Sequence, residues 1–311
     1  MGKTSLLSII VPSYNEQDNV SLLYEQVKEY VKEPFELIYV DDGSSDDTLK
    51  NIQALSKKHT EVHFITFSRN FGHQAALRAG LRYAKGDAVI SMDADLQHPP
   101  KMLPELIAKW REGYEVVYTI RDDTKSDISW FKRTTSQTFY KIMNFLSGLT
   151  IDEGAADFRL LDRKVVDVIN NEKESDLFLR GYINWIGFKQ VGIPYVPQKR
   201  HSGVSKYPLK KMIAFASKGV TQFSVKPLRL AFLLAVGAFM LSFVYLLYAL
   251  WAALVQDTAV PGWLSLVILF VFLQGIQFML IGLIGEYLGR TFIQTKHRPE
   301  YIVSETTCNE G

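Results

Sequence analysis

Apolar and polar positions along the first 198 residues repeat with the periods of strands and helices in turn. Short continuous apolar runs have the pattern of strands buried on both faces, and they cover Leu6–Pro12, Glu36–Val40, Val62–Phe67, Ala88–Met92 and Glu115–Thr119. Between them, apolar residues at helical spacing predict helices over Asn19–Lys32, Asp46–Lys58, Gly72–Ala84 and Pro104–Glu112. Strands that alternate with helices predict an α/β domain over residues 1–198, with a mainly parallel sheet covered on both faces.

The hydrophobic pattern changes beyond residue 229. Leu230–Val255 carries no charge, and Trp263–Gly285 repeats this pattern after a short turn. Each run exceeds the roughly 20 residues that cross about 30 Å of hydrocarbon. The runs predict a transmembrane hairpin over residues 230–289, with helices at about 230–255 and 263–288, and a tail over residues 290–311. A pair of buried core helices is the alternative, which uncharged runs of this length disfavour.

Charge is distributed unevenly around these runs. Residues 199–229 contain eight Lys or Arg and no Asp or Glu, and their apolar residues recur at helical spacing. A basic amphipathic helix beside a membrane span is typical of a segment that lies in the headgroup plane. A solvated helix packed on the soluble domain is the alternative. Because basic residues flank both ends of the hairpin, the positive-inside rule places the α/β domain and the tail in the cytoplasm.

Overall composition restricts the class of protein only weakly. The formal net charge is +2, and the single cysteine, Cys308, excludes an intrachain disulfide and a cysteine-rich metal site. No Gly-x-Gly-x-x-Gly follows the first strand, and no complete Walker-type phosphate loop exists. Both absences argue against dehydrogenases and P-loop ATPases. The sequence predicts a lipid bilayer and no nucleic acid as a partner, and it leaves a homo-oligomer open.

Acidic pairs stand directly after two of the predicted strands. Asp41 and Asp42 follow the second apolar run, and Asp93 and Asp95 follow the fourth. Sheets of this kind bind ligands beyond the carboxyl ends of their strands. Asp93, Asp95 and the carboxamide of Gln97 offer hard oxygen ligands, which suit Mg²⁺ or Mn²⁺ bound to a diphosphate. Asp41 and Asp42 either accept hydrogen bonds from a base or ribose, or belong to an ordinary turn before a helix.

The motifs Val11–Glu16, Val40–Asp46, Arg69–His73, Met92–Pro100 and Ser205–Tyr207 run through the chain in this order. Together they resemble family-2 glycosyltransferases, in the subgroup of dolichyl-phosphate mannose synthases and the bacterial polyprenyl-phosphate glycosyltransferases of the GtrB type. The resemblance covers nearly the whole chain, including the paired spans. It implies a GT-A fold, which is Rossmann-like, and an inverting, metal-dependent transfer.

The resemblance also implies roles for individual residues. Those that would bind the nucleotide sugar are Pro12, Tyr14, Glu16, Asp41, Asp42 and Asp93. Asp95 and Gln97 would hold Mg²⁺ or Mn²⁺. Asp157 matches the family's acidic residue beside the acceptor and is, with Asp93, a candidate catalytic residue. The residues that match its acceptor-phosphate site are Arg200, Ser205 and Lys206.

The chemistry of the acceptor bears on the role of Asp157. A polyprenyl phosphate is an anion at neutral pH, so its oxygen needs little or no deprotonation before it attacks the sugar, and a general base has little to do. Asp157 then orients the acceptor or a sugar hydroxyl, or stabilises positive charge near the anomeric carbon. Arg200 and Lys206 would reduce the repulsion between the diphosphate and the acceptor phosphate.

These features predict a polyprenyl-phosphate glycosyltransferase of the cell envelope, in a bacterial inner membrane with its catalytic domain in the cytoplasm. It would transfer one sugar from a nucleotide sugar to undecaprenyl phosphate, with UDP-glucose favoured and N-acetylglucosamine, mannose or aminoarabinose as alternatives. A processive polysaccharide synthase is disfavoured because a Gln-x-x-Arg-Trp motif is absent and two spans are too few for a pore. A non-catalytic, membrane-anchored module that binds nucleotide sugars is disfavoured because the motif residues are intact.

Overall fold

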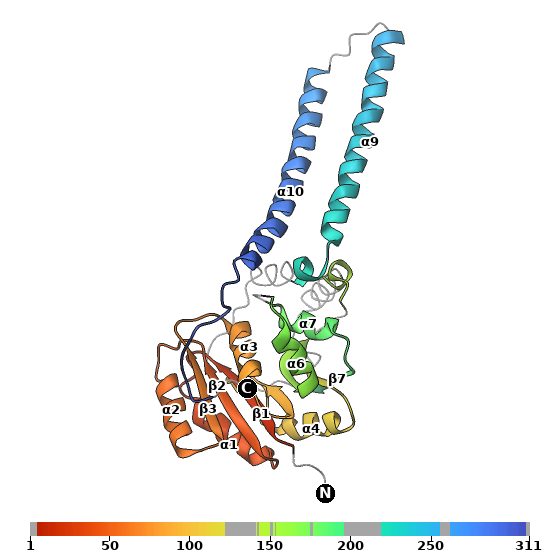
Figure 1. The fold of residues 1–311 in the computed structure, drawn as a ribbon. Coiled ribbons are helices and arrows are strands. Elements are labelled where there is room, and N and C mark those ends of the chain that lie inside the picture. The colour runs from red at the N-terminus through yellow and green to blue at the C-terminus, as the bar shows by residue number, and fades with distance from the viewer. Residues whose placement is uncertain are drawn as a thin grey trace, which may run out of the picture. The chain divides into compact units, whose positions relative to one another are not determined.

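The computed structural model describes residues 5–121, 141, 143–149, 152, 154–174, 177–195, 219–255 and 262–308. Its largest element is an eight-stranded sheet in the order β7-β5-β6-β4-β1-β2-β3-β8 (Figure 1). The strands are β1 (Leu7–Ser13), β2 (Phe35–Asp41), β3 (Val62–Phe67), β4 (Ala88–Ser91), β5 (Val116–Arg121), β6 (Ala155–Asp162), β7 (Gln190–Tyr195) and β8 (Val303–Thr306). The helices are α1 (Val20–Tyr30), α2 (Thr48–Lys58), α3 (His73–Tyr83), η1 (Pro100–Met102), α4 (Leu103–Arg111), α6 (Arg163–Asn171), α7 (Leu179–Trp185), α9 (Lys226–Val255) and α10 (Trp263–Thr295).

The sheet is mainly parallel, as the sequence predicts. β4, β1, β2 and β3 pair in parallel, and so do β5 and β7. β6 runs antiparallel between β4 and β5, and β8 runs antiparallel along β3. The strands and helices predicted between residues 6 and 119 are all present, with ends within two residues of the predicted ones. Continuous apolar runs were a sufficient signal because both faces of these strands are buried.

Helices cover both faces of the sheet. The main hydrophobic core lies under α1, α2 and α4, where Leu23, Ile52 and Leu106 pack with side chains of the central strands. On the other face, α3 contacts β1 and β2, and α6 contacts β4 and β6. α3 approaches β1 closely because it carries Gly80, where an added Cβ would lie 2.9 Å from Cβ of Ile10. This close packing holds α3 against β1.

The chain after the second apolar helix returns to the sheet, which the sequence analysis did not predict. β8 pairs with β3, with Thr306 opposite Ile65. Just before β8, the ring of Tyr301 stacks on Phe67 with centroids 5.0 Å apart. Residues Met1–Phe145, Leu149–Phe215 and Arg298–Gly311 accordingly form one compact unit, and Leu146–Gly148 with Ala216–His297 form the other. The segment after α10 is therefore an edge strand of the α/β unit.

The second unit contains two helices that are long and apolar enough to cross a membrane. The candidate spans, Lys226–Tyr248 and Ser265–Thr295, each have a mean hydropathy of 2.5 and are not buried inside the protein, unlike a pair of core helices. The chain leaves the α/β unit before α9 and rejoins its sheet after α10. Most of the predicted basic helix over residues 199–229 lies outside the described residues, and Gly219–Phe223 within it is helical.

Candidate active site

The motif residues gather at one edge of the sheet because neighbouring strands end there. Ser13 at the end of β1 pairs with Asp41 at the end of β2. On the other side of β1, Ile10 pairs with Ser91, the last residue of β4. The loops after β1, β2 and β4 therefore start side by side, which is the ligand-binding edge expected for such a sheet.

Asp41 and Asp42 build the loops of this edge. Asp41 is buried, and its Oδ2 accepts a hydrogen bond of 2.7 Å from the hydroxyl of Thr66. Asp42 accepts hydrogen bonds from the backbone N–H groups of Phe71 (2.6 Å) and Gly72 (2.9 Å). Burial raises the pKa of Asp42, although these N–H groups favour its ionised form. The Asp42 side chain thus ties the loop after β3, and with it the start of α3, to the end of β2.

The loop after β1 leaves an aromatic ring open to solvent. Pro12 is buried within β1, whereas 47% of Tyr14 is exposed. Asn15 has a positive φ of 56°, and its side-chain oxygen accepts a hydrogen bond of 2.9 Å from the backbone of Ser45. Glu16 accepts a hydrogen bond of 2.6 Å from Asn19. The loop is therefore held in place, and the Tyr14 ring is free on one side to stack against a planar ligand.

The segment after β4 alternates between buried and partly exposed side chains. Ala94 and Leu96 are buried, whereas Asp93, Asp95 and Gln97 are partly exposed. Leu96 has a φ of 59°, and Oδ1 of Asp95 accepts a hydrogen bond of 3.1 Å from the backbone of Gln97. This tight turn places three oxygen-bearing side chains within five residues, and hard oxygen donors of this kind fit a Mg²⁺ or Mn²⁺ ion. Among the described residues no three acidic, histidine or cysteine side chains form a metal site by themselves.

Asp157 is enclosed by arginines. Ser91 donates a hydrogen bond of 2.5 Å to its backbone oxygen, which fixes β6 beside the end of β4. Nη2 of Arg159 lies 3.1 Å from Oδ1 of Asp157, and Nη2 of Arg180 lies 3.1 Å from Oδ2. Burial alone would raise the pKa of Asp157, but the charges of Arg180 and Arg159 hold it well below its usual range. Burial also lowers the pKa of Arg159, to about 10, which leaves it protonated at neutral pH.

Two histidines lie against the same acids. Nε2 of His73, the first residue of α3, lies 3.6 Å from Oδ1 of Asp93 and 3.9 Å from Oδ2 of Asp157. Nδ1 of His98 accepts a hydrogen bond of 3.1 Å from the backbone N–H of Asp93. The side chain of His98 is buried and its ring stacks on Phe158, whereas 42% of the His73 side chain is exposed. His73 is therefore the histidine of the pair that a ligand can reach.

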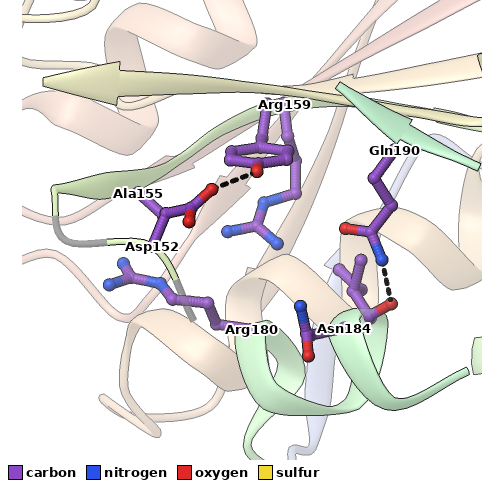
Figure 2. Close-up of a pocket in the computed structure, with 8 residues that line it drawn as sticks. Asp152, Ala155, Arg159, Arg180, Asn184 and Gln190 are labelled. Atoms are coloured by element: carbon purple, nitrogen blue, oxygen red, sulfur yellow. Dashed lines mark hydrogen bonds between the residues drawn. The ribbon is translucent and has the colours of Figure 1, made fainter. Parts of the chain in front are cut away.

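A small open pocket, with a cavity volume of about 20 Å³, adjoins the arginine cluster (Figure 2). Arg159 and Arg180 line it from β6 and α7, and Asn184 and Gln190 extend its polar wall. Asp152 accepts a hydrogen bond from the hydroxyl of Tyr118, another lining residue. The two guanidinium groups thus contact Asp157 and also border a solvent-open pocket.

The structure brings most of the predicted site residues to this edge. Asp93, Asp95, Gln97 and Asp157 lie at the ends of adjoining strands, beside the loops that carry the other predicted nucleotide-binding residues. The predicted acceptor-phosphate residues, Arg200, Ser205 and Lys206, lie outside the described residues.

The sequence analysis assigned no role to His73, Arg159 or Arg180. His73 ends the motif Arg69–His73, and Arg159 lies two residues after Asp157, but their contacts follow only from the tertiary fold. Arg180 follows no motif and is brought to Asp157 only by the tertiary fold.

Comparisons with known proteins agree with this geometry. The profile of glycosyl transferase family 2 matches residues 8–169, and that of the GtrB C-terminal hairpin matches residues 226–291. This chain belongs to glycosyl transferase family 2. The matched family segment contains the acidic motifs and Asp157, and the matched hairpin contains α9 and most of α10.

Full-length relatives support the same membership. The enzyme is 42% identical to YkcC of Bacillus subtilis, an uncharacterised glycosyltransferase, over 98% of this chain and 95% of that one. It is 39% identical to the bactoprenol glucosyl transferase of Shigella phage SfV, over 96% and 97% of the two chains. Among solved structures, a mannosyltransferase from Pyrobaculum calidifontis matches with a TM-score of 0.50 and 19% identity, over 73% of this chain and 65% of that one. This structural likeness establishes the GT-A fold.

Proposed function

We propose that this enzyme transfers one glucose from UDP-glucose to undecaprenyl phosphate, with inversion, at the cytoplasmic face of a bacterial inner membrane. The observation that carries the proposal is the combination, in one chain, of a family-2 catalytic domain with a GtrB-type hairpin. Two relatives match over nearly their whole length. The one from Shigella phage SfV is named a bactoprenol glucosyl transferase, and the one from Escherichia coli is named a prophage bactoprenol glucosyl transferase homolog.

Donor binding would use the loops after β1 and β2. The exposed ring of Tyr14 offers a face for the base, and Glu16, Asp41 and Asp42 would contact the nucleotide directly or hold the loops that do. Since Asp42 already accepts hydrogen bonds from Phe71 and Gly72, its contribution would come largely through the position of that loop. Asp93 would contact the sugar or the nucleotide.

Asp95 and Gln97 would hold a divalent cation, Mg²⁺ or Mn²⁺, with diphosphate oxygens as further ligands. The bound cation would neutralise charge on the leaving nucleotide. The positions of Asp93, Asp95 and Gln97 on one partly exposed turn support this assignment. The solved mannosyltransferase from Pyrobaculum calidifontis, which shares this fold, is described in complex with GDP-Man and Mn²⁺.

The acceptor phosphate would approach from the side of Asp157. Both oxygens of this carboxylate are paired with guanidinium groups, so it is a poor proton acceptor. Its role would be to orient the acceptor or a sugar hydroxyl and to offset positive charge that develops at the anomeric carbon. Arg200, Ser205 and Lys206 would hold the phosphate itself, as their match to the family's motif implies.

Transfer of radiolabel from UDP-glucose to a butanol-extractable lipid tests this proposal. The purified enzyme in undecaprenyl-phosphate-containing vesicles should label the lipid, and Arg200→Ala should lower kcat/KM for the lipid by about ten- to a hundredfold while the affinity for UDP-glucose is retained. Arg111→Ala is the matched control, because Arg111 is an exposed arginine paired with Glu33 at 2.8 Å. Absence of labelled lipid with the wild-type enzyme contradicts the proposed reaction, and an unaffected Arg200→Ala variant removes Arg200 from the acceptor site.

A further inference from the structure

His73 links two acids that belong to opposite halves of the site. Asp93 lies in the loop after β4, and Asp157 lies in β6, yet both carboxylates approach Nε2 of His73, at 3.6 and 3.9 Å. His73 itself is held from a third direction, because Asp42 binds the backbone N–H of Gly72, the residue before it. Two segments therefore approach the imidazole, and a third fixes the backbone just before it.

These distances are longer than direct hydrogen bonds, which join heavy atoms at about 2.7–3.2 Å. The imidazole therefore lies near both carboxylates without being saturated by either. With 42% of its side chain exposed, it remains open to a ligand. Such a group can exchange its contact with a carboxylate for one with a ligand hydroxyl at little cost.

Other groups near the two acids cannot replace His73. The oxygens of Asp157 are already paired with Arg159 and Arg180. Near Asp93, Nδ1 of His98 lies 3.5 Å from Oδ2 of Asp93, but it accepts a hydrogen bond from the backbone N–H of Asp93 and in that tautomer has no proton to donate to the carboxylate. His73 is therefore placed to donate to Asp93 from Nε2.

A structural role does not account for the imidazole. α3 begins at His73 and its start is held by Asp42 through the N–H of Gly72, so the helix does not depend on the His73 side chain.

We propose that His73 is a positioning residue that aligns Asp93 and Asp157 around the sugar that is transferred. The inference rests on the proposed function, in which Asp93 belongs to the donor side and Asp157 to the acceptor side. The transferred carbon must pass between the two sides, and His73 lies between their carboxylates. Its imidazole keeps both acids directed at the same space and is itself within reach of a sugar hydroxyl.

Three variants test the inference in the full-length enzyme. His73→Leu removes both ring nitrogens, His73→Gln keeps an N–H donor at a similar reach, and His63→Leu on β3 is a control that contacts neither acid. We expect His73→Leu to lower kcat by about ten- to a hundredfold, as for a lost contact with a charged group, with a change of no more than about threefold in the Kd of UDP-glucose. His73→Gln should recover most of this loss, and His63→Leu should match the wild type.

Release of UDP is measured together with labelling of the lipid, with and without undecaprenyl phosphate. A wild-type enzyme that releases UDP but labels no lipid contradicts the proposed acceptor, and the effect of the variants on UDP release still tests His73. The inference itself is overturned if His73→Leu keeps the wild-type kcat, if its loss is matched by an equal loss of UDP-glucose affinity, or if His73→Gln is no better than His73→Leu.

Discussion

Nη2 of Arg180, on α7, lies 3.1 Å from Oδ2 of Asp157, on β6. Arg159 occupies the other oxygen of the same carboxylate at 3.1 Å. Two cations around one buried acid keep that acid ionised, because protonation would leave both guanidinium groups without their counter-charge. Asp157 is therefore arranged as a fixed negative charge and not as a group that takes up and releases a proton.

Asp157→Asn should strongly reduce transfer without changing the shape of the pH profile. The variant loses the fixed charge, but no catalytic proton transfer is lost with it, since the attacking phosphate is already ionised. The measurement is kcat/KM for the lipid acceptor between pH 5 and 9, in the wild type and the variant. An acidic limb that is present in the wild type and absent from Asp157→Asn would identify Asp157 as a base.

The same ion pairs predict how stability depends on pH. The pKa of Asp157 is lower in the folded state than its ordinary value of about 3.9, so its stabilisation is present above about pH 4 and is lost as the pH falls toward the folded-state pKa. Thermal unfolding of wild type and Asp157→Asn should therefore differ most near neutral pH and converge in acid. A constant difference down to pH 3 would show that the carboxylate does not stabilise the fold through its charge.

Removal of divalent metal should abolish transfer. Asp95 and Gln97 present only oxygen ligands, so EDTA should inactivate the enzyme and Mg²⁺ or Mn²⁺ should restore it. Asp95→Asn should need a higher metal concentration for half-maximal activity, and the exposed Asp18→Asn is a control outside the site. Full transfer in excess EDTA would rule out the metal assignment.

The hydrophobic pattern predicted strands β1 to β5 but not β6, β7 or β8. The difference has a physical reason. β1 to β5 are marked by uninterrupted apolar runs, whereas β6 carries Arg159 inside its apolar run, where burial is tolerated through the pair with Asp157. β8 is a short, polar edge strand whose partner, β3, lies far earlier in the chain. No local pattern could have indicated either.

The site was predictable where a motif coincides with a strand end. The acids after β2 and β4 follow from strand order and alternation, because parallel strands bring their carboxyl ends to one edge. The role of Asp157 rested on a family resemblance, and its two arginines could not be inferred. Arg180 reaches Asp157 from α7, a contact between distant segments that sequence periodicity does not encode.

The returning tail should contribute to the stability of the catalytic unit. Arg78 on α3 pairs with Glu300 at 3.3 Å, with both side chains mostly buried. A double-mutant cycle with Arg78→Ala and Glu300→Ala should give a coupling free energy of about 0.5–3 kcal/mol in thermal or urea unfolding. Glu305, which bonds Gln53 at an exposed position, is the control, and Glu305→Ala should change stability by less than about 0.5 kcal/mol. Equal effects at the two sites would contradict a structural role for the Arg78 pair.

Thiol labelling in intact cells tests the proposed topology. Cys308 is a poor probe, because burial raises its pKa to about 11 and it is a protonated thiol at neutral pH. In a Cys308→Ser background, a cysteine at the exposed Ser304 on β8 should be protected from impermeant reagents, and one at Asp257, outside the described residues, should react. Labelling of Ser304→Cys from outside the cell would reverse the proposed orientation.

The central claim, transfer of one glucose to a polyprenyl phosphate, is tested most directly by mass spectrometry of the lipid product. The enzyme is given undecaprenyl phosphate, a divalent cation and an equimolar mixture of UDP-glucose, UDP-N-acetylglucosamine, GDP-mannose and UDP-aminoarabinose, with only the glucose isotopically labelled. We predict one product, undecaprenyl phosphate bearing a single labelled hexose, and much less of it with Asp95→Asn at the same low concentration of the cation. An unlabelled sugar on the lipid would contradict the assignment of glucose, a chain of sugars would indicate a processive synthase, and an unmodified lipid would contradict the transfer reaction itself.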